Sequence, residues 1–371
     1  MKIGTDQYNT FDTMTMDCWN DRVYYEGKEF PAGHFATEIL NFAGVIHDPL
    51  LERITVLTAL VDDLSTAEKS KRHDIAAQLK PLLYDTVSWI YTCPPFCYCE
   101  SQSAYENLEH ALSEERLDQD YEEEKAHLPY LALSFCEPIL RILVAIYNFC
   151  LLIRAFEKKY LRRAKRRNAD AFAKAAHECF DEDDSFLILL EQMPFGEVEE
   201  FFSYPRVITG FKYFQDENDE EKWKTAQRVI CKRAIDFYVF DLMNGLHHGH
   251  APSQCQGCGR YFLTTNGHIP KYCDGVAPQD SRYTCRQYGA MMHQKEQNKQ
   301  HPVYRLFNTR TDTIRKHHQR GKISDDLRRE ALYLAGSYRD KALMDNDYAA
   351  DGYARDMELE HIYAEAEKRL K

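Results

Sequence analysis

The chain has 371 residues, of which 29% are charged and 44% are hydrophobic, a composition that excludes an intrinsically disordered protein. Its N-terminal residues lack the apolar segment of a secretory signal. The longest apolar segment, Ile139–Ile153, is interrupted by Arg141 and is shorter than the roughly 20 residues that span a bilayer. We therefore expect a core helix, no membrane partner and, because the twelve cysteines are scattered, a reducing cytoplasmic location.

The net charge is −12, but the basic residues are concentrated in two segments. Ser281–Arg329 contains 12 Lys and Arg against 4 Asp and Glu, and Arg154–Arg167 contains 8 basic residues and one Glu. Basic segments on an acidic protein are typical of polyanion binding. They are equally compatible with docking against the chain's own acidic runs, so both interpretations stay open at this point.

In chain order, residues 1–34 are expected to be irregular, with a small hairpin over 22–30, and residues 35–246 to form an α-helical domain. Leu50, Ile54, Leu57, Val61 and Leu64 recur at helical spacing. Further helices are expected through Ile75–Ile90, from near Pro138, over Ala169–Phe180 and over Glu221–Leu246. We expect a separate cysteine-rich module at 247–300 and helices again over 301–371, opened by His301-Pro302, ended by Gly321 and resumed after a cap at Ser324.

Four cysteines in the region 247–300 follow the spacing of a structural zinc site: Cys255, Cys258, Cys273 and Cys285. Glycines flank the second cysteine, as in a zinc knuckle, where backbone NH groups turn towards thiolate sulfurs. Four thiolates leave no open coordination position, so Zn²⁺ here would fold a module and not catalyse. Arg260–Thr265 is strand-like, and Asn266-Gly267 predicts a hairpin whose return strand delivers Cys273. A helix beginning near Tyr283, capped by Asp280 or Ser281, completes a treble-clef-like finger.

Two other groups of metal-ligating residue types are present. Cys93, Cys97 and Cys99 lack a nearby fourth ligand, and we interpret them as reduced thiols. His247, His248 and His250 precede the finger; they suit a helix C-terminus, although the sequence leaves a ligand role for them open.

The segment CQGCGRYFLTTNGHIPKYCDG, SRYTCRQYGA and the following HPVYRLFNTRTDTIRKHHQRGKIS resembles a bacterial family of unknown function with a cysteine-rich finger near its C-terminus. It is also distantly similar to the CGNR-type zinc finger, although Cys285-Arg286-Gln287-Tyr288 stands in place of Cys-Gly-Asn-Arg. Fingers of that type are thought to bind DNA, so the resemblance implies DNA as a partner.

The expected fold is therefore mainly α, with a helical N-terminal body, a small zinc finger and C-terminal helices. Enzyme motifs are scarce: a nuclease built on His293, Asn298 and His301 is the remaining catalytic alternative, although their spacing does not reproduce a hairpin-borne base. DNA binding is the leading hypothesis, and a protein-interaction role with a purely structural zinc is the second. The DNA contacts expected in the first case are Arg282, Arg286, Lys295, Arg305, Arg310, Arg315 and Lys316.

Overall fold

The computed structural model describes residues 13–42, 49–118, 130–164, 166–184, 186, 205–216, 219–265, 267 and 271–370. The chain divides into two compact units, Met1–Lys271 and Tyr272–Lys371. Each unit has its own apolar core.

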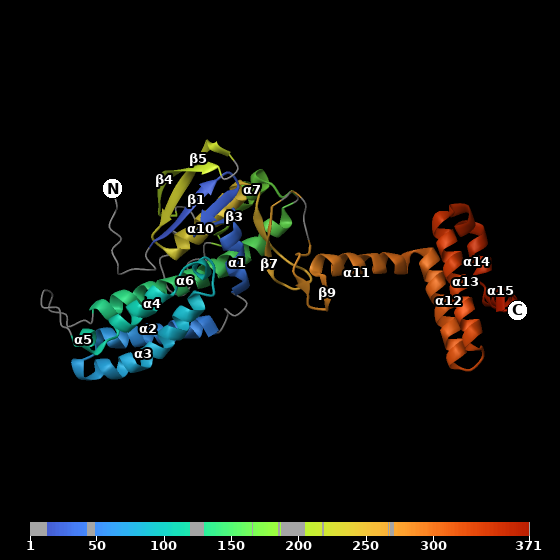
Figure 1. Ribbon diagram of the computed structural model, residues 1–371, viewed down its shortest axis with the longest axis horizontal. Helices are drawn as coiled ribbons and strands as arrows, with labels where there is room; N and C mark the ends of the chain where they lie inside the picture. The colour runs from blue at the N-terminus through green and yellow to red at the C-terminus, as the bar shows by residue number, and fades with distance from the viewer. Residues whose placement is uncertain are drawn as a thin grey trace. The chain divides into compact units, whose positions relative to one another are not determined.

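A five-stranded antiparallel sheet organises one part of the first unit (Figure 1). Its strand order is β3-β2-β1-β5-β4, so strands from the start of the chain pair with strands that follow residue 206. The strands are β1 (Met14–Trp19), β2 (Arg22–Tyr25), β3 (Lys28–Pro31), β4 (Val207–Asp216) and β5 (Asp219–Cys231). The hairpin expected over 22–30 is present as β2 and β3, but it belongs to this larger sheet.

The sheet corrects the expectation of a mainly α fold with strand confined to the finger. Glu221–Leu246 was expected to be one helix, but its first half is the strand β5 and only its second half is a helix, α10 (Ala234–His247). The physical reason lies in the alternation along β5: Val229 and Cys231 are buried on one face, whereas Arg228 lies on the other. β4 ends with residues 215–216, and β5 begins with residues 219–221.

Helices nevertheless make up most of the regular structure in the first unit. Ile54, Leu57, Val61 and Leu64 are all buried, as their spacing predicts. The helices other than α10 are α1 (His34–Phe42), α2 (Leu51–Thr66), α3 (Lys69–Ile90), η3 (Phe96–Tyr98), α4 (Gln102–Ala111), α5 (Glu114–Leu117), α6 (Tyr130–Lys159), η4 (Leu161–Arg163) and α7 (Ala169–Phe180).

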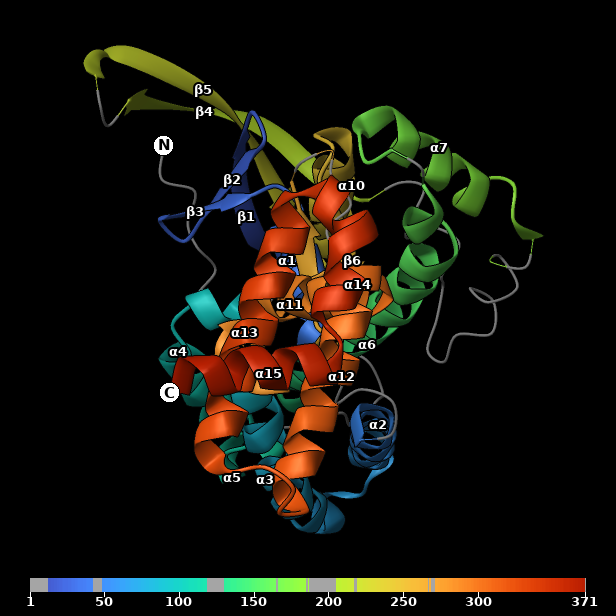
Figure 2. The same cartoon turned by 90° about the vertical axis from the view of Figure 1, so that its right-hand side faces the viewer.

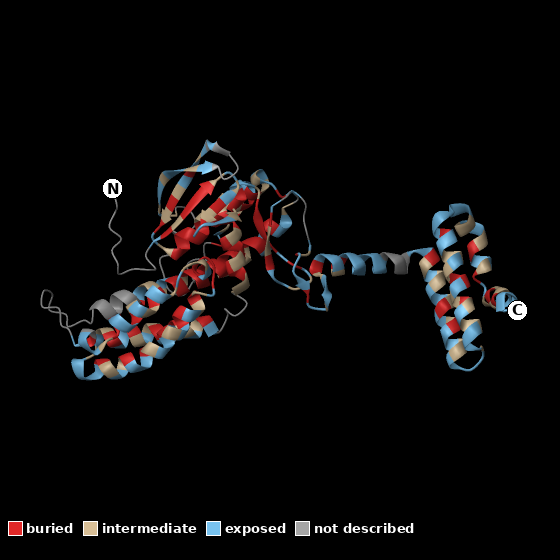
Figure 3. Ribbon diagram, viewed as in Figure 1, coloured by how far each residue is buried: buried red, intermediate tan, exposed pale blue. Residues whose placement is uncertain are grey.

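The apolar segment 139–153 lies within α6, and the structure confirms that it is a core helix. Cys136–Arg163 is long and apolar enough to cross a membrane by length and composition, but 67% of its apolar window is buried inside the protein. Figure 3 shows this burial continuing from α6 into the neighbouring helices.

Close packing of α10 against the start of α1 joins the sheet to the helices. A Cβ atom added to Gly245 would lie 2.8 Å from the Cα atom of Gly33, so only glycine permits this approach. The buried Asp241 carboxylate accepts hydrogen bonds from the backbone NH groups of Gly33 (3.0 Å) and Ala36 (2.9 Å) at the N-terminus of α1. Burial raises the pKa of Asp241 to about 6, despite these bonds.

The second unit begins with a short ribbon and continues in helices. Val303, Ile314, Leu334 and Ile362 lie in its core. As expected, a helix begins at Pro302, and Ser324 caps the next one by accepting from Leu327 N at 3.2 Å. The elements are β8 (Val276–Ala277), β9 (Asp280–Thr284), α11 (Cys285–Gln300), α12 (Pro302–Gln319), α13 (Asp325–Met344), η5 (Tyr348–Gly352), α14 (Tyr353–Asp356) and α15 (Leu359–Leu370).

Candidate metal centre and nucleic-acid interface

The first two cysteines lie in a tight turn between β6 (Ala251–Gln254) and β7 (Tyr261–Thr264), which pair antiparallel. Cys255 N donates to Arg260 O at 2.8 Å, and Gly259 N donates to Cys255 O at 2.9 Å. Gly259 has φ +75°, a left-handed conformation that favours glycine. Gly257 N lies 3.4 Å from Cys255 Sγ, the NH-to-sulfur contact expected of a zinc knuckle.

The other two cysteines flank the β8–β9 ribbon. Cys285 is the first residue of α11, and its backbone NH donates to Gly275 O at 2.8 Å, while Arg286 N donates to Cys273 O at 3.1 Å. A reciprocal pair of hydrogen bonds fixes the start of the helix: Thr284 N donates to Gln287 Oε1, and Gln287 N donates to Thr284 Oγ1. This capping box therefore places Cys285 at a defined position.

The four predicted cysteines come together in space. One sulfur from each of Cys255, Cys258, Cys273 and Cys285 lies within 4.8 Å of the others. Cys255, Cys273 and Cys285 are buried and Cys258 is half-buried. Tetrahedral zinc with Zn–S bonds of about 2.3 Å requires sulfur atoms about 3.8 Å apart, so a small contraction closes the shell. The donor set therefore fits a closed four-thiolate metal site.

The finger adds one pairing that the sequence did not predict and differs in one detail. β7 pairs with β6, which precedes the knuckle. Asn266 of the expected turn and residues 268–270 of the expected return strand lie outside the described residues. Residues 280–284 form β9 and not a helix start, because the cap is Thr284.

The other metal candidates do not form a comparable cluster among the described residues. His250 is buried, and its Nδ1 lies 3.0 Å from Ala32 O, whereas His247 and His248 stand at the end of α10. Burial raises the pKa of Cys93 to about 12 and also raises the pKa values of Cys97 and Cys99. Within the described parts of the chain, only the quartet brings three or more such ligands together.

The predicted DNA-contacting residues fall into three groups. Three of them form ion pairs with exposed carboxylates: Arg282 with Asp280 (2.7 Å), Arg286 with Asp274 (3.0 Å) and Arg315 with Asp312 (2.9 Å). Lys295, Arg305 and Lys316 are exposed and, among the described residues, have no carboxylate partner. Arg310 is half-buried, and its Nε has no hydrogen-bond partner there.

Three exposed cations lie on one side of this helix: Arg305 and Lys316 of α12, and Arg320, the residue that caps its C-terminus. Arg305, Thr309, Lys316 and Arg320 are separated by four or seven residues, a spacing that places side chains on the same side. The opposite side carries the buried Val303 and Ile314. Arg320 and Lys322 were missed by the sequence-based list, although Arg320 follows Lys316 at the same four-residue step. We call Arg305, Lys316 and Arg320 the cationic face of α12.

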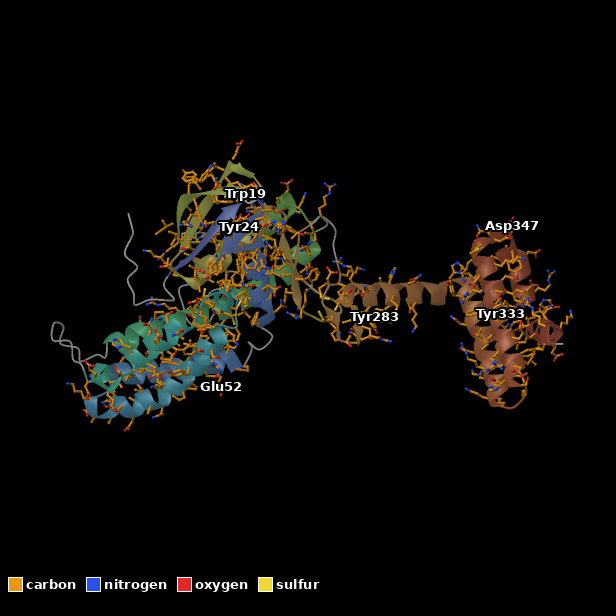
Figure 4. All side chains as sticks on the ribbon, viewed as in Figure 1. Trp19, Tyr24, Glu52, Tyr283, Tyr333 and Asp347 are labelled. Carbon is orange, nitrogen blue, oxygen red and sulfur yellow. The ribbon has the colours of Figure 1, made fainter. Side chains whose placement is uncertain are left out.

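Aromatic residues accompany these charges near the start of the second unit. Tyr283 is 36% exposed on β9, and the guanidinium of Arg282 lies 5.7 Å from the centre of its ring (Figure 4).

The residues of the nuclease hypothesis lie on and after α11. α11 is exposed at every residue from 290 to 296. His293 lies in this exposed stretch, whereas His301 Nδ1 accepts from Val303 N and caps α12. The side chain of Asn298, the third residue of the nuclease hypothesis, lies outside the described residues.

Comparisons with known proteins give one match. Residues 203–369 match the family model described as Family of unknown function (DUF6076). The matched range contains the four cysteines and the cationic face, which supports the expected likeness to an uncharacterised family with a C-terminal finger. No curated protein and no solved structure matches the chain. The CGNR-type likeness therefore stays a hypothesis.

Proposed function

We propose that this protein binds DNA and has no catalytic activity of its own, and that a structural Zn²⁺ in the four-cysteine site folds the finger. Zinc is favoured because four thiolates in a closed shell match its tetrahedral preference. The arrangement leaves no position for a metal-bound water, so it suits a structural site.

The cationic face of α12 is the observation that carries the DNA proposal. A protein that only needs basic residues for internal docking would pair them, yet Arg305, Lys316 and Arg320 have no carboxylate partner among the described residues. Asn308, Thr309 and Gln319 are exposed on the same helix and supply further hydrogen-bonding groups. Cations and short polar side chains on one helix face match the requirements of phosphate contact.

The ion-paired arginines can also contact phosphate, because little free energy is lost when their ion pairs break. Exposed pairs such as Arg282 with Asp280 contribute about 0–1 kcal/mol, so a phosphate competes readily for the guanidinium. Hydrogen bonding to Arg282 lowers the pKa of Asp280, so that carboxyl stays ionised at neutral pH and the competition is between two anions.

The decisive experiment measures duplex DNA affinity at several salt concentrations, on metal-loaded protein, for the double variant R305A/K316A. We expect a roughly tenfold loss of affinity on all sequences and a salt slope reduced by about 1.8, because about 0.9 is lost with each phosphate contact. The matched control R328A/R329A also removes two charges from this unit, but both arginines are paired with Asp325. Equal losses for the two double variants would contradict the proposed surface.

The metal is tested separately by elemental analysis and by chelation. We expect one Zn²⁺ per chain, and C258S is expected to lower the metal content and to abolish the ordered finger, because binding free energy of a structural zinc is also folding free energy. C97S is the matched control, since Cys97 is an exposed cysteine outside the quartet. Protein purified without chelator that contains no metal would end the zinc proposal while leaving the DNA test intact.

A further inference from the structure

The strand β4 forms an open edge of the five-stranded sheet. It runs for ten residues, Val207–Asp216, and pairs with β5 on one side only. No other strand pairs with it among the residues that the structure describes. Figure 2 shows β4 and β5 extending as a ribbon beyond β1, β2 and β3. Alternate NH and CO groups of such a strand point away from the sheet and are available to another strand.

Over most of its length, this edge lacks the features that usually prevent pairing with another chain; the register shift between Gln215 and Asp216 lies at its end. It contains no proline, and its single lysine, Lys212, is neutralised within its own sheet by Asp17 at 2.9 Å. Its apolar side chains are instead exposed: Ile208 by 52%, Phe211 by 72% and Tyr213 by 67%. A long, apolar and unguarded edge indicates a surface that another strand covers.

We propose that β4 pairs antiparallel with β4 of a second copy of this chain, about a twofold axis at Phe211. An axis perpendicular to the sheet keeps corresponding faces on the same side, so residues opposite one another must both be odd-numbered or both even-numbered. Centring on Phe211 places Phe211 opposite Phe211 of the second copy, Thr209 opposite Tyr213, and Ile208 opposite Phe214. These are aromatic and β-branched pairs, which stabilise adjacent strands.

Charge and space favour this register over its neighbours. A centre at Lys212 would place two lysines directly opposite each other, which is destabilising. The centre at Phe211 places Lys212 opposite Gly210, and nothing lies within 4 Å of a Cβ atom added to that glycine. The lysine stem of the second copy therefore has room to pack, and its ammonium group keeps its own Asp17 partner.

The expected dimer is a modest one. Each exposed apolar side chain of β4 contributes on the order of 100 Å² of buried surface. Together with the strand backbone, each copy therefore buries several hundred Å². That area is below the roughly 800 Å² per partner of a standard stable interface. Dimerisation is therefore expected at tens of micromolar protein and not at nanomolar concentration.

The test is a charge exchange in the full chain, followed by sedimentation equilibrium. The wild type is expected to dimerise reversibly. F211K and F211E should each be monomeric, because the substitution places two like charges directly opposite at the axis. A mixture of F211K and F211E should recover a dimer that contains one copy of each. Because Phe211 is mostly exposed, both variants are expected to keep the wild-type circular dichroism.

W223K is the matched control. Trp223 is also 67% exposed and lies on the same ribbon, but on β5, opposite Gln215 and away from the free side of β4. It is expected to leave the dimer intact. A monomeric wild type at these concentrations overturns the proposal. So does a dimer that F211K does not dissociate, or a mixture of the two variants that stays monomeric. None of these outcomes depends on DNA binding.

Discussion

Two basic segments of this protein differ in how their charges are placed. In the segment 154–167, Arg154 donates to Leu40 O at 3.0 Å, Arg162 pairs with the buried Glu157 at 2.9 Å, and Arg167 is only 3% exposed. On α12, by contrast, Arg305, Lys316 and Arg320 extend from a helix whose other side is apolar. These charges of the first segment are engaged within the unit, although Lys158, Arg163 and Arg166 of the same segment are exposed. The three cations named on the second have no carboxylate partner among the described residues.

The difference follows from what precedes each segment in the chain. The first segment is the end of α6, whose apolar part is anchored in the core, so its cations emerge among backbone carbonyls and a buried carboxylate. α12 is amphipathic along its whole length and buries only one side. Local charge density alone therefore does not identify a polyanion-binding surface.

The largest expected loss of stability follows from replacing Arg167, the most buried cation of the first segment. Its Nε donates to Thr264 Oγ1 at 3.2 Å and its guanidinium to Pro252 O at 3.3 Å, so it ties the end of η4 to β6 and β7. Burial lowers the pKa of this guanidinium, a sign of how strongly it is desolvated. R167A should lower the free energy of unfolding by roughly 2–4 kcal/mol, since it leaves a buried carbonyl unpaired and a cavity.

Urea unfolding of R167A and R166A compares the stability effect of a buried arginine with that of an exposed one. Arg166 is the adjacent, exposed residue, and its removal should change stability by less than about 0.5 kcal/mol. Neither variant should change the salt slope of DNA binding. A weaker slope for R167A in protein that remains folded would mean that the first segment also contacts phosphate.

The sequence predicted the cysteine cluster better than the sheet, for a physical reason. The positions of the Cys255 and Cys258 sulfurs depend on residues that are adjacent in the sequence, because one glycine-containing turn holds both. The caps of α12 and α13 are equally local. The pairing of β1 with β5 instead joins residues such as Met16 and Val229 across most of the chain, and no local pattern specifies it. The ion pair of Arg315 depends on the side-chain rotamers of Arg315 and its partner, and the amino-acid sequence does not determine these rotamers.

A smaller loss of stability is expected when Asp17 is replaced. This residue also pairs with cations of its own unit. Its carboxylate accepts from Arg228 (2.7 Å) and Lys212 (2.9 Å) across three strands. Burial alone would raise the pKa of Asp17, but hydrogen bonds from Arg228 and then Lys212 outweigh it, and the pKa is lowered from 3.8. D17N should therefore cost about 1–2 kcal/mol at neutral pH.

The sign of the pH dependence makes this prediction specific. Because the folded-state pKa lies below the unfolded value, the stabilisation by Asp17 is complete above the unfolded pKa and is lost as the pH falls through the folded one. The difference between wild type and D17N in urea unfolding should thus shrink at acid pH. E29Q is the control, because Glu29 and its partner Arg22 are both exposed. A difference that stays constant with pH would rule out the ion pair as its cause.

The smallest effect concerns Asp312, the one carboxylate that interrupts the cationic face. It lies seven residues after Arg305 and four before Lys316, and it pairs with Arg315 at 2.9 Å. D312N removes a charge that repels phosphate and releases Arg315. We expect DNA affinity to rise about two- to fivefold and the salt slope to steepen by up to about 0.9, with stability nearly unchanged because the pair is exposed. D340N, which releases Arg339 on α13 instead, should leave affinity unaltered. If D340N strengthened binding as much as D312N, net charge and not the α12 face would govern the interaction, and the contrast between the two basic segments would lose its functional meaning.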